Sequence, residues 1–377
     1  MDYKQSKFII MIHLLQNKTA VFTVILLILT ASCAVPYTAE DPPVEHPKPD
    51  SLFVNVVFSV REHHSTKITG VTNENESDIV RWSIFAFEHG TGHFRYASSS
   101  SGSPLTLNLL ANQRYSCHAI VNYPVSGTGA FDPSGVRVPG DIMDKTAYIG
   151  DCSAQSLPMF GSTYAIPRPG MEDNVTINVR RLVSRIDIRG LKVDFSGKPR
   201  LSGKTFILRS IYITNVYRTT RYEQDYMFTE LSSTRSAWYN TGGWHRGETA
   251  DTGIDSIVGD ISINREVSAD TPYNVTHSFY VFPNPTPLSQ DIRTMEAWTR
   301  RCTRLVIEAS LDSDIVYYAI NVPDMERNQI YAASNVIIHG RGSNDPEIID
   351  IDPDIITATV EPLIEDSWDG AGNVTLD

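Results

Sequence analysis

Two groups of side chains in this sequence have types and spacing that could hold a metal ion. His89 and His93 lie four residues apart on either side of a Gly-Thr-Gly turn. The second group is a set of alternating acidic residues near the C-terminus: Asp345, Glu347, Asp350, Asp352 and Asp354. Its oxygen-rich spacing suits calcium. However, the glycines indicate a loop for the histidines, and the acidic segment lacks both an internal glycine and the EF-hand register. We therefore favour exposed turn histidines and a solvated acidic linker, and we predict no metal and no cofactor.

Catalytic motifs are missing from the sequence. It contains no Gly-x-Ser-x-Gly, no phosphate-binding loop, no dinucleotide fingerprint and no His-Glu-x-x-His. Clustered Tyr and Trp residues could form a sugar-stacking surface, and Trp238, Tyr239 and Trp244 stand out because they flank a glycine pair in a loop. A glycosidase would need two facing carboxylates, roughly 5 to 9.5 Å apart. We predict that the chain is not an enzyme and keep glycan contact at these three residues as an alternative.

The N-terminus has the features of a secretory signal that ends at a cysteine. Three lysines precede the apolar run 20–29, and the small residues 30–32 follow it immediately before Cys33. A bilayer-spanning helix would need about 20 apolar residues, so this run is too short to remain as one. The arrangement resembles a bacterial lipoprotein signal, in which the thiol is acylated and the chain is cut before it. We predict lipidation of Cys33 and removal of residues 1–32, with an ordinary signal peptide as the alternative.

Charge and cysteine content exclude further classes. The net charge of −12 is poorly suited to nucleic acid, because cationic side chains supply the affinity for phosphates. Besides Cys33 there are Cys117, Cys152 and Cys302, with no Cys-x-x-Cys spacing. That pattern excludes a dense disulfide scaffold and a thiolate zinc site. Cys117 and Cys152 could pair in an oxidising compartment; otherwise they are small buried hydrophobes.

Most of the chain reads as β-strands. Residues 34–50 hold five prolines and are typical of an extended tether. From residue 51 onward, β-rich runs alternate with Gly, Ser, Asn and Pro, and helices are scarce, with a short one predicted over 141–149. We predict strands after the first one at 80–87, 105–109, 115–121, 175–188 (one strand, or two joined at a bend), 206–216, 276–282, 304–311, 315–321 and 335–339. Such chains form antiparallel β-sandwiches.

The first and last predicted strands have particularly regular apolar faces. The first strand, over 52–60, is marked by the apolar residues Phe53, Val54, Val56, Phe58 and Val60. In the last strand, over 355–363, one side carries Ile356, Ala358 and Val360. Alternation of this kind predicts strands with one face on a core.

Several segments, taken in order, resemble fimbrillin-type proteins of Bacteroidetes, which are type V pilus subunits. The run VRWSIFAFEHGTGHFRY at 80–96 is similar to their early strand pair, and LLANQRYSCHAIVNYP follows at 109–124. LPMFGS at 157–162 precedes VTINVRRLVSRIDI at 175–188. FYVFPNP begins at Phe279, and ERNQIYAASNVIIHGRGSNDPE begins at Glu326.

The resemblance implies a fold and a role. The expected fold is two transthyretin-like antiparallel β-sandwich domains in tandem, 51–185 and 186–377. The expected role is an outer-membrane, surface-exposed lipoprotein of a fimbrium, in a stalk, anchor or tip position. Its partners would be other fimbrial subunits, bound by β-strand exchange, the membrane through the lipid, and adhesion ligands on host or bacterial surfaces. A surface glycan-binding lipoprotein remains the alternative.

The resemblance also implies how strand exchange would be prepared. In stalk members of the family, an arginine-specific protease removes the first strand and opens a groove. Here 34–47 contains no Arg or Lys, and Lys48 precedes Pro49, which leaves Arg61 as the credible cut point. Without a cut, the lipid stays and the subunit behaves as an anchor. The last strand is the candidate donor, and the alternative, that it belongs to its own domain, stays open.

Overall fold

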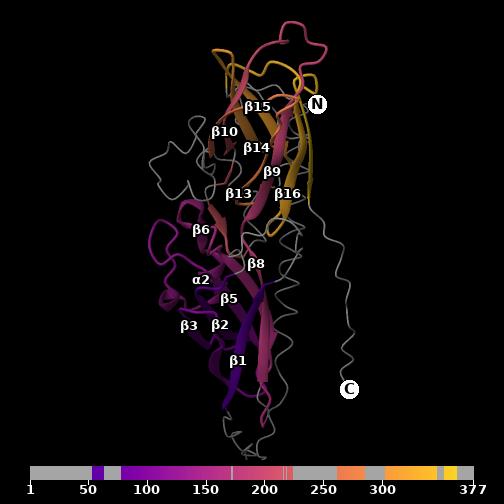
Figure 1. The fold of residues 1–377 in the computed structure, drawn as a ribbon. Helices are drawn as coiled ribbons and strands as arrows, with labels where there is room; N and C mark the ends of the chain where they lie inside the picture. Colours follow the sequence, from indigo (N-terminus) through magenta and orange to yellow (C-terminus); the bar gives the residue numbers. More distant parts are fainter. Residues whose placement is uncertain are drawn as a thin grey trace, which may run out of the picture. The chain divides into compact units, whose positions relative to one another are not determined.

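The computed structural model describes residues 53–62, 78–170, 173–214, 216–217, 219–223, 261–284, 302–345 and 352–362 (Figure 1). By its contacts the chain divides into residues 1–50 and 51–377, and every described residue belongs to the second unit. These residues form β-strands with one five-residue α-helix and two 3-10 turns. The prediction of an all-β protein is confirmed.

A seven-stranded sheet is built entirely from residues before 182. Its strands are β1 (Phe53–Glu62), β2 (Trp82–Glu88), β3 (Phe94–Ser99), β4 (Leu105–Leu110), β5 (Tyr115–Val121), β7 (Met159–Ala165) and β8 (Asp173–Arg181). The spatial order is β3-β2-β5-β7-β8-β1-β4. β7 and β8 pair only at two positions, Met159 with Arg181 and Phe160 with Arg180. This short ladder is the corner between β3-β2-β5-β7 and β8-β1-β4, and one apolar core takes side chains from both parts.

The other face of β2 and β5 is covered by the chain between residues 123 and 157. Phe131 packs edge-on against Phe85, and both belong to the larger apolar core. This segment contains α2 (Pro139–Met143) and β6 (Thr146–Tyr148), which pairs with β11 (Thr219–Arg221). The predicted helix over 141–149 is therefore wrong beyond Met143, because the pairing with β11 draws the next residues into a strand.

The remaining strands form two four-stranded sheets around the larger core. One sheet has the order β12-β10-β14-β15 and the other β13-β9-β16-β17. Their bounds are β9 (Ser184–Val193), β10 (Phe206–Thr214), β12 (Ile261–Glu266), β13 (Tyr273–Val281), β14 (Thr303–Leu311), β15 (Asp314–Val322), β16 (Ile330–Ile338) and β17 (Ile356–Pro362). Two strand pairs in the described residues are parallel, β1 with β8 and β9 with β16, and the others are antiparallel.

Two local predictions can be compared directly with the strands. The run 175–188 forms two strands, β8 and β9, separated by the buried Leu182 and Val183, so the version with a bend is correct. A tight turn joins β14 to β15, and its Asp312 has a φ of 55°, a left-handed conformation that Asp tolerates. Sheet membership changes between β8 and β9; the division into domains at 185 and 186 stays a prediction.

Candidate functional site

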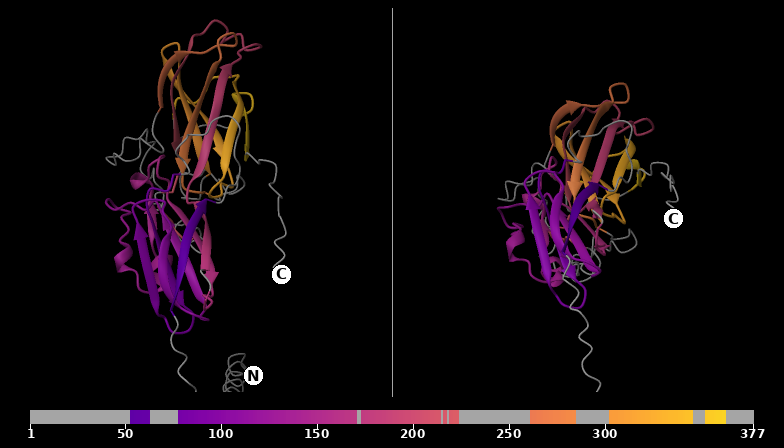
Figure 2. Two further views of the ribbon diagram at one scale, coloured as in Figure 1. Left: turned by 60° about the horizontal axis from the view of Figure 1, so that its bottom comes forward. Right: turned by 90° about the horizontal axis from the view of Figure 1, so that it is seen from below.

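The first strand lies inside its sheet rather than at an edge. β1 pairs antiparallel with β4 over 53–58 and parallel with β8 over 56–62 (Figure 2). Val54, Val56 and Phe58 are buried in the core, and Val60 packs against it. Phe53 faces the other way and is 47% exposed. Each fully buried side chain of this size contributes about 1.5–3 kcal/mol relative to exposure, so β1 is an integral part of this core.

The two halves of β1 are held differently. Residues 53–58 pair with β4, and only 56–58 also pair with β8. Asn108 Nδ2 donates to Asn55 Oδ1 across the β4 ladder at 3.2 Å. The ladder with β4 ends at Phe58. From Ser59 to Glu62, β8 is the strand paired with β1 among the described residues, with the Ser59 and Thr176 hydroxyls 3.2 Å apart.

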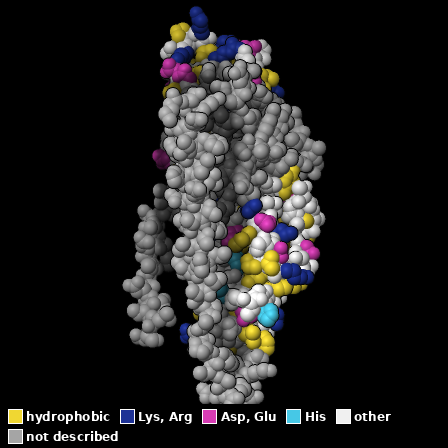
Figure 3. Space-filling model, turned by 180° about the vertical axis from the view of Figure 1, so that it is seen from behind, with side chains coloured by type: hydrophobic (Ala, Val, Ile, Leu, Met, Phe, Trp, Pro, Cys, Tyr) yellow, Lys and Arg dark blue, Asp and Glu magenta, His cyan; other side chains and the backbone are white. Residues whose placement is uncertain are grey.

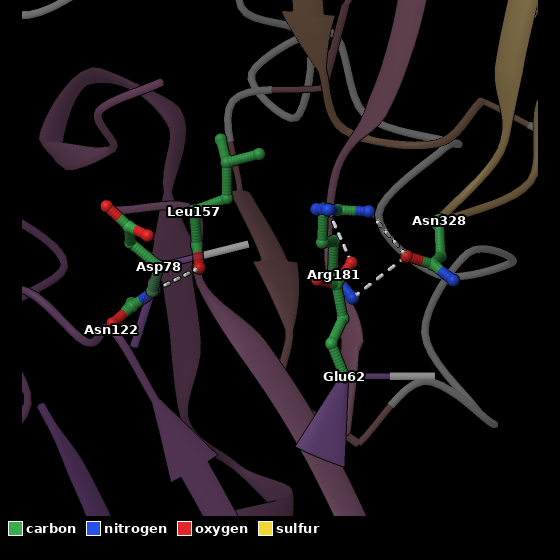
Figure 4. A network of polar contacts seen from close by, with 6 residues as sticks. All are labelled: Glu62, Asp78, Asn122, Leu157, Arg181 and Asn328. Carbon is green, nitrogen blue, oxygen red and sulfur yellow. Dashed lines mark hydrogen bonds and ion pairs between the residues drawn. The ribbon is translucent and has the colours of Figure 1, made fainter. Parts of the chain in front are cut away.

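A buried ion pair marks the C-terminal end of β1. Arg61 is exposed, whereas the Glu62 side chain is only 5% exposed and forms an ion pair with Arg181, the last residue of β8. The backbone N–H and Nη1 of Arg181 both donate to Asn328 Oδ1, at 3.3 and 3.5 Å (Figure 4). Asn328 belongs to the connection between β15 and β16, so these contacts join β1 to the other pair of sheets.

Asn122 fixes the chain where it enters β2. Its Nδ2 donates to the carbonyls of Asp78 and Leu157, at 2.7 and 3.1 Å (Figure 4), and its Oδ1 accepts from the N–H of Val80 at 2.9 Å. Asn122 is buried and has a φ of 54°. The segment 63–77 thus connects two positions that are each held by buried polar contacts.

Neither of these polar clusters is predicted from the sequence. Glu62 did carry a signal, because it continues the inward positions of Val56, Phe58 and Val60 as a charged residue. A carboxylate on a core face needs a buried partner. Its partner Arg181 lies more than a hundred residues away in the sequence, so alternation alone gives no means of choosing it.

The candidate donor strand lies in its own sheet. β17 pairs antiparallel with β16, Ile356 is buried, and Ala358 and Val360 pack against the larger core. The three predicted residues therefore face one side together. In this structure that side is the core formed with β9 and β16 rather than a surface.

The three cysteines of the described residues form no disulfide. Cys117, Cys152 and Cys302 are buried, and the open pairing of Cys117 with Cys152 is not made. Burial raises the pKa of Cys117 to about 12 and raises the pKa of Cys152 as well. Such thiols are unreactive small hydrophobes near neutral pH.

A buried histidine also lies on β5. His118 packs between Phe87 and Phe160, with ring centroids 5.8 and 6.0 Å away. Burial lowers the pKa of His118 to about 4. The side chain is therefore neutral at physiological pH, and its surroundings are those of a core residue.

Where they are described, the metal candidates lie in turns and in connections between strands. His93 is exposed, with Nδ1 3.4 Å from the buried Glu88 carboxylate. Among the described residues, no three His, Cys, Asp or Glu side chains are grouped to hold a metal ion. Glu347 and Asp350 lie outside those residues.

Other predicted sites lie outside the described residues: Cys33, Trp238, Tyr239 and Trp244. No helix in the described part of the chain is long and apolar enough to cross a membrane. On the described part of the face in Figure 3, acidic and basic side chains are interspersed with apolar ones. That part of the surface therefore shows no field of a single charge sign.

Comparison with known proteins identifies the fold. No protein-family model matches the chain, and no curated protein matches it by sequence. Solved structures of bacterial surface proteins do match, which gives the chain the fimbrillin-type fold. A candidate cell adhesion protein from Bacteroides eggerthii superposes with a TM-score of 0.59 at 16% identity, covering 82% of this chain and 95% of that one.

Two further structures agree. A candidate cell adhesion protein from Parabacteroides distasonis has a TM-score of 0.52 at 14% identity, with 82% and 98% covered. A fimbrilin, FimA, from Porphyromonas gingivalis has a TM-score of 0.50 at 15% identity, again with 82% and 98% covered. At these identities the likeness establishes the fold, and the resemblance noted in the sequence is confirmed at that level.

Proposed function

We propose that this chain is a subunit of a bacterial surface fimbrium that supports adhesion by docking β-strands and carries out no reaction. The observation behind the proposal is a shared fold over 82% of the chain with a fimbrilin and with candidate adhesion proteins. The names of the three solved structures compared above refer to fimbriae or adhesion and not to a reaction. We further propose that 51–185 and 186–377 are its two sandwich domains.

The placement of β1 supports docking by strand exchange. If β1 left its position, β4 and β8 would lose a shared neighbour and the core would lose Val54, Val56 and Phe58. Unpaired backbone groups beside empty core positions recruit a strand with apolar residues at alternate positions. Ile356, Ala358 and Val360 of a second copy have that spacing, and donating them requires β17 to leave β16.

The same strand connects docking to anchoring. A lipid on Cys33 would hold the chain at the outer membrane through the tether 34–50 and β1. Hydrolysis after Arg61, followed by departure of the fragment that ends there, would free residues 62–377 from that lipid and vacate the β1 position. An uncut chain would remain an anchored member of the fimbrium.

Strand exchange is tested by digestion with an arginine-specific protease. Purified residues 51–377, here called the body, should give an SDS-resistant ladder on unboiled gels once residues 51–61 are released. The Arg61→Ala variant is the matched control and should give neither that cut nor the ladder. A chain cut completely at Arg61 that stays monomeric at high concentration would refute strand exchange.

The lipid anchor is tested separately by labelling bacteria that express the full chain with an alkynyl palmitate analogue. Label on the chain should disappear in Cys33→Ala and persist in Cys302→Ala, which alters a buried thiol of the body. Label retained in Cys33→Ala would eliminate the proposed anchor.

A further inference from the structure

The part of β1 that contains the proposed cut point is paired on one side only among the described residues. Over Ser59 to Glu62 the described neighbour is β8 alone, because the β4 ladder stops at Phe58. A strand end that is paired on one side opens locally at low cost. Arg61 itself is exposed, so backbone pairing and solvent exclusion alone would protect the Arg61–Glu62 bond poorly.

The Glu62 side chain supplies the missing restraint. Glu62 lies opposite Val179 in β8, and Arg181 is the next residue of β8 on the same face. The carboxylate is 5% exposed and the guanidinium 17% exposed. Opening this end of β1 would separate the two ions and leave the Arg181 guanidinium in a site with little water. Breaking a buried pair in this way is strongly unfavourable.

The pair has a further support from the other sheets. Asn328 Oδ1 accepts from Arg181 twice, and the Asn328 N–H donates to the Val183 carbonyl at 2.8 Å. Asn328 is buried and holds a φ of 58°. The guanidinium is thereby fixed in place before Glu62 reaches it, so little freedom is lost when the pair forms.

We propose that Glu62, Arg181 and Asn328 form a lock that keeps β1 in its sheet and shields the Arg61–Glu62 bond from proteolysis. The inference rests on the proposed function, and it assigns the uncut, β1-retaining form as the resting state of this subunit. Hydrolysis adds water across the bond between the Arg61 carbonyl carbon and the Glu62 nitrogen. It leaves a carboxylate on Arg61 and an ammonium group on Glu62. The lock controls access of the protease to that bond.

The test measures how fast a new N-terminus appears at residue 62 in the purified body with an arginine-specific protease, by mass spectrometry. Arg181→Gln breaks the lock without altering either residue of the scissile bond. Glu62→Gln breaks it from the other side, and peptides spanning 57–66 with Glu or Gln at 62 correct for the preference of the protease. Asp314→Asn is the matched control, because it removes an exposed ion pair with Arg341, 3.1 Å long.

We expect cleavage on the order of 100-fold faster in Arg181→Gln and, after correction, in Glu62→Gln, because cleavage follows the population of the opened strand. Asn328→Gly keeps the left-handed backbone, removes the amide, and should accelerate cleavage about fivefold. Asp314→Asn should stay within about twofold of the unaltered protein. Urea unfolding establishes whether each variant is folded under the assay conditions. If Arg181→Gln is not folded, the cleavage rates of Asn328→Gly and Glu62→Gln decide the test.

The lock is refuted if the unaltered protein is cut at Arg61 as fast as the peptide, or if the variants are cut no faster than Asp314→Asn. The fate of the cut body separates this result from the proposed function. Fast cleavage of the variants without an SDS-resistant ladder supports the lock and counts against strand exchange. A ladder with equal cleavage rates supports exchange and counts against the lock.

Discussion

Phe58 is the largest side chain that β1 contributes to the core, so truncating it tests how firmly the strand is built in. The side chain is fully buried, and its backbone neighbours in β4 and β8 are Leu105 and Val175. Truncation of a buried Phe to Ala typically costs 3–5 kcal/mol, of which the cavity is one part. Leu105 and Val175 are half-buried and can move toward the gap, so we expect about 3 kcal/mol for Phe58→Ala.

The matched control is Val57→Ala, which alters the adjacent, half-buried residue on the outward face of the same strand. It should cost less than about 1 kcal/mol. Urea unfolding of the body, followed by tryptophan fluorescence, reports the unfolding of this core, because Trp82 lies in the same core as Phe58. Hydrogen exchange of the β1 amides should accelerate in Phe58→Ala and not in Val57→Ala. Equal costs for the two variants would mean that β1 is not held by its core side chains, which would contradict strand exchange driven by filling the β1 position.

Three further outcomes are expected. Because the pKa of His118 is about 4 in the folded chain and about 6.5 when unfolded, stability should be complete above pH 6.5 and fall by about 3 kcal/mol as the pH drops toward 4. His118→Phe should remove that part of the pH dependence in urea titrations, and an unchanged profile would contradict the assignment. Cys117 and Cys152 should react with a maleimide at pH 7.5 only after unfolding, and rapid modification of the native chain, measured by mass, would disagree. Asn122→Ala should lower the free energy of unfolding by about 2 kcal/mol more than Asn112→Ala, which has the same left-handed backbone but an exposed side chain.

Alternation in the sequence predicts β1 well because its inward positions are all Val or Phe before Glu62. A strand with one core face needs only that local pattern. β14 is predicted as well, although it is buried at every position, because its run of β-rich residues is bounded by the turn that precedes β15. β12 was missed because ISINRE is short, largely exposed and half polar, so its strand conformation comes from pairing with β10. Propensity is a weak guide where a neighbouring strand decides the conformation.

The polar clusters were out of reach for a different reason. Asn122 is an Asn at the end of a strand, where the sequence suggests only a turn. Its role depends on Asp78 and Leu157 arriving from distant parts of the chain. The same is true of Arg181, one of two adjacent arginines in RRLV, of which only the second reaches Glu62.

The parallel ladder between β1 and β8 has a consequence for biogenesis. If the chain is exported from its N-terminus, as proposed, β1 reaches the far side of the membrane well before Asp173–Arg181. During that interval β1 has no parallel neighbour, and contacts between residues so distant in sequence form slowly. A similar strand from a chain exported beside it would then compete for the position between β4 and β8.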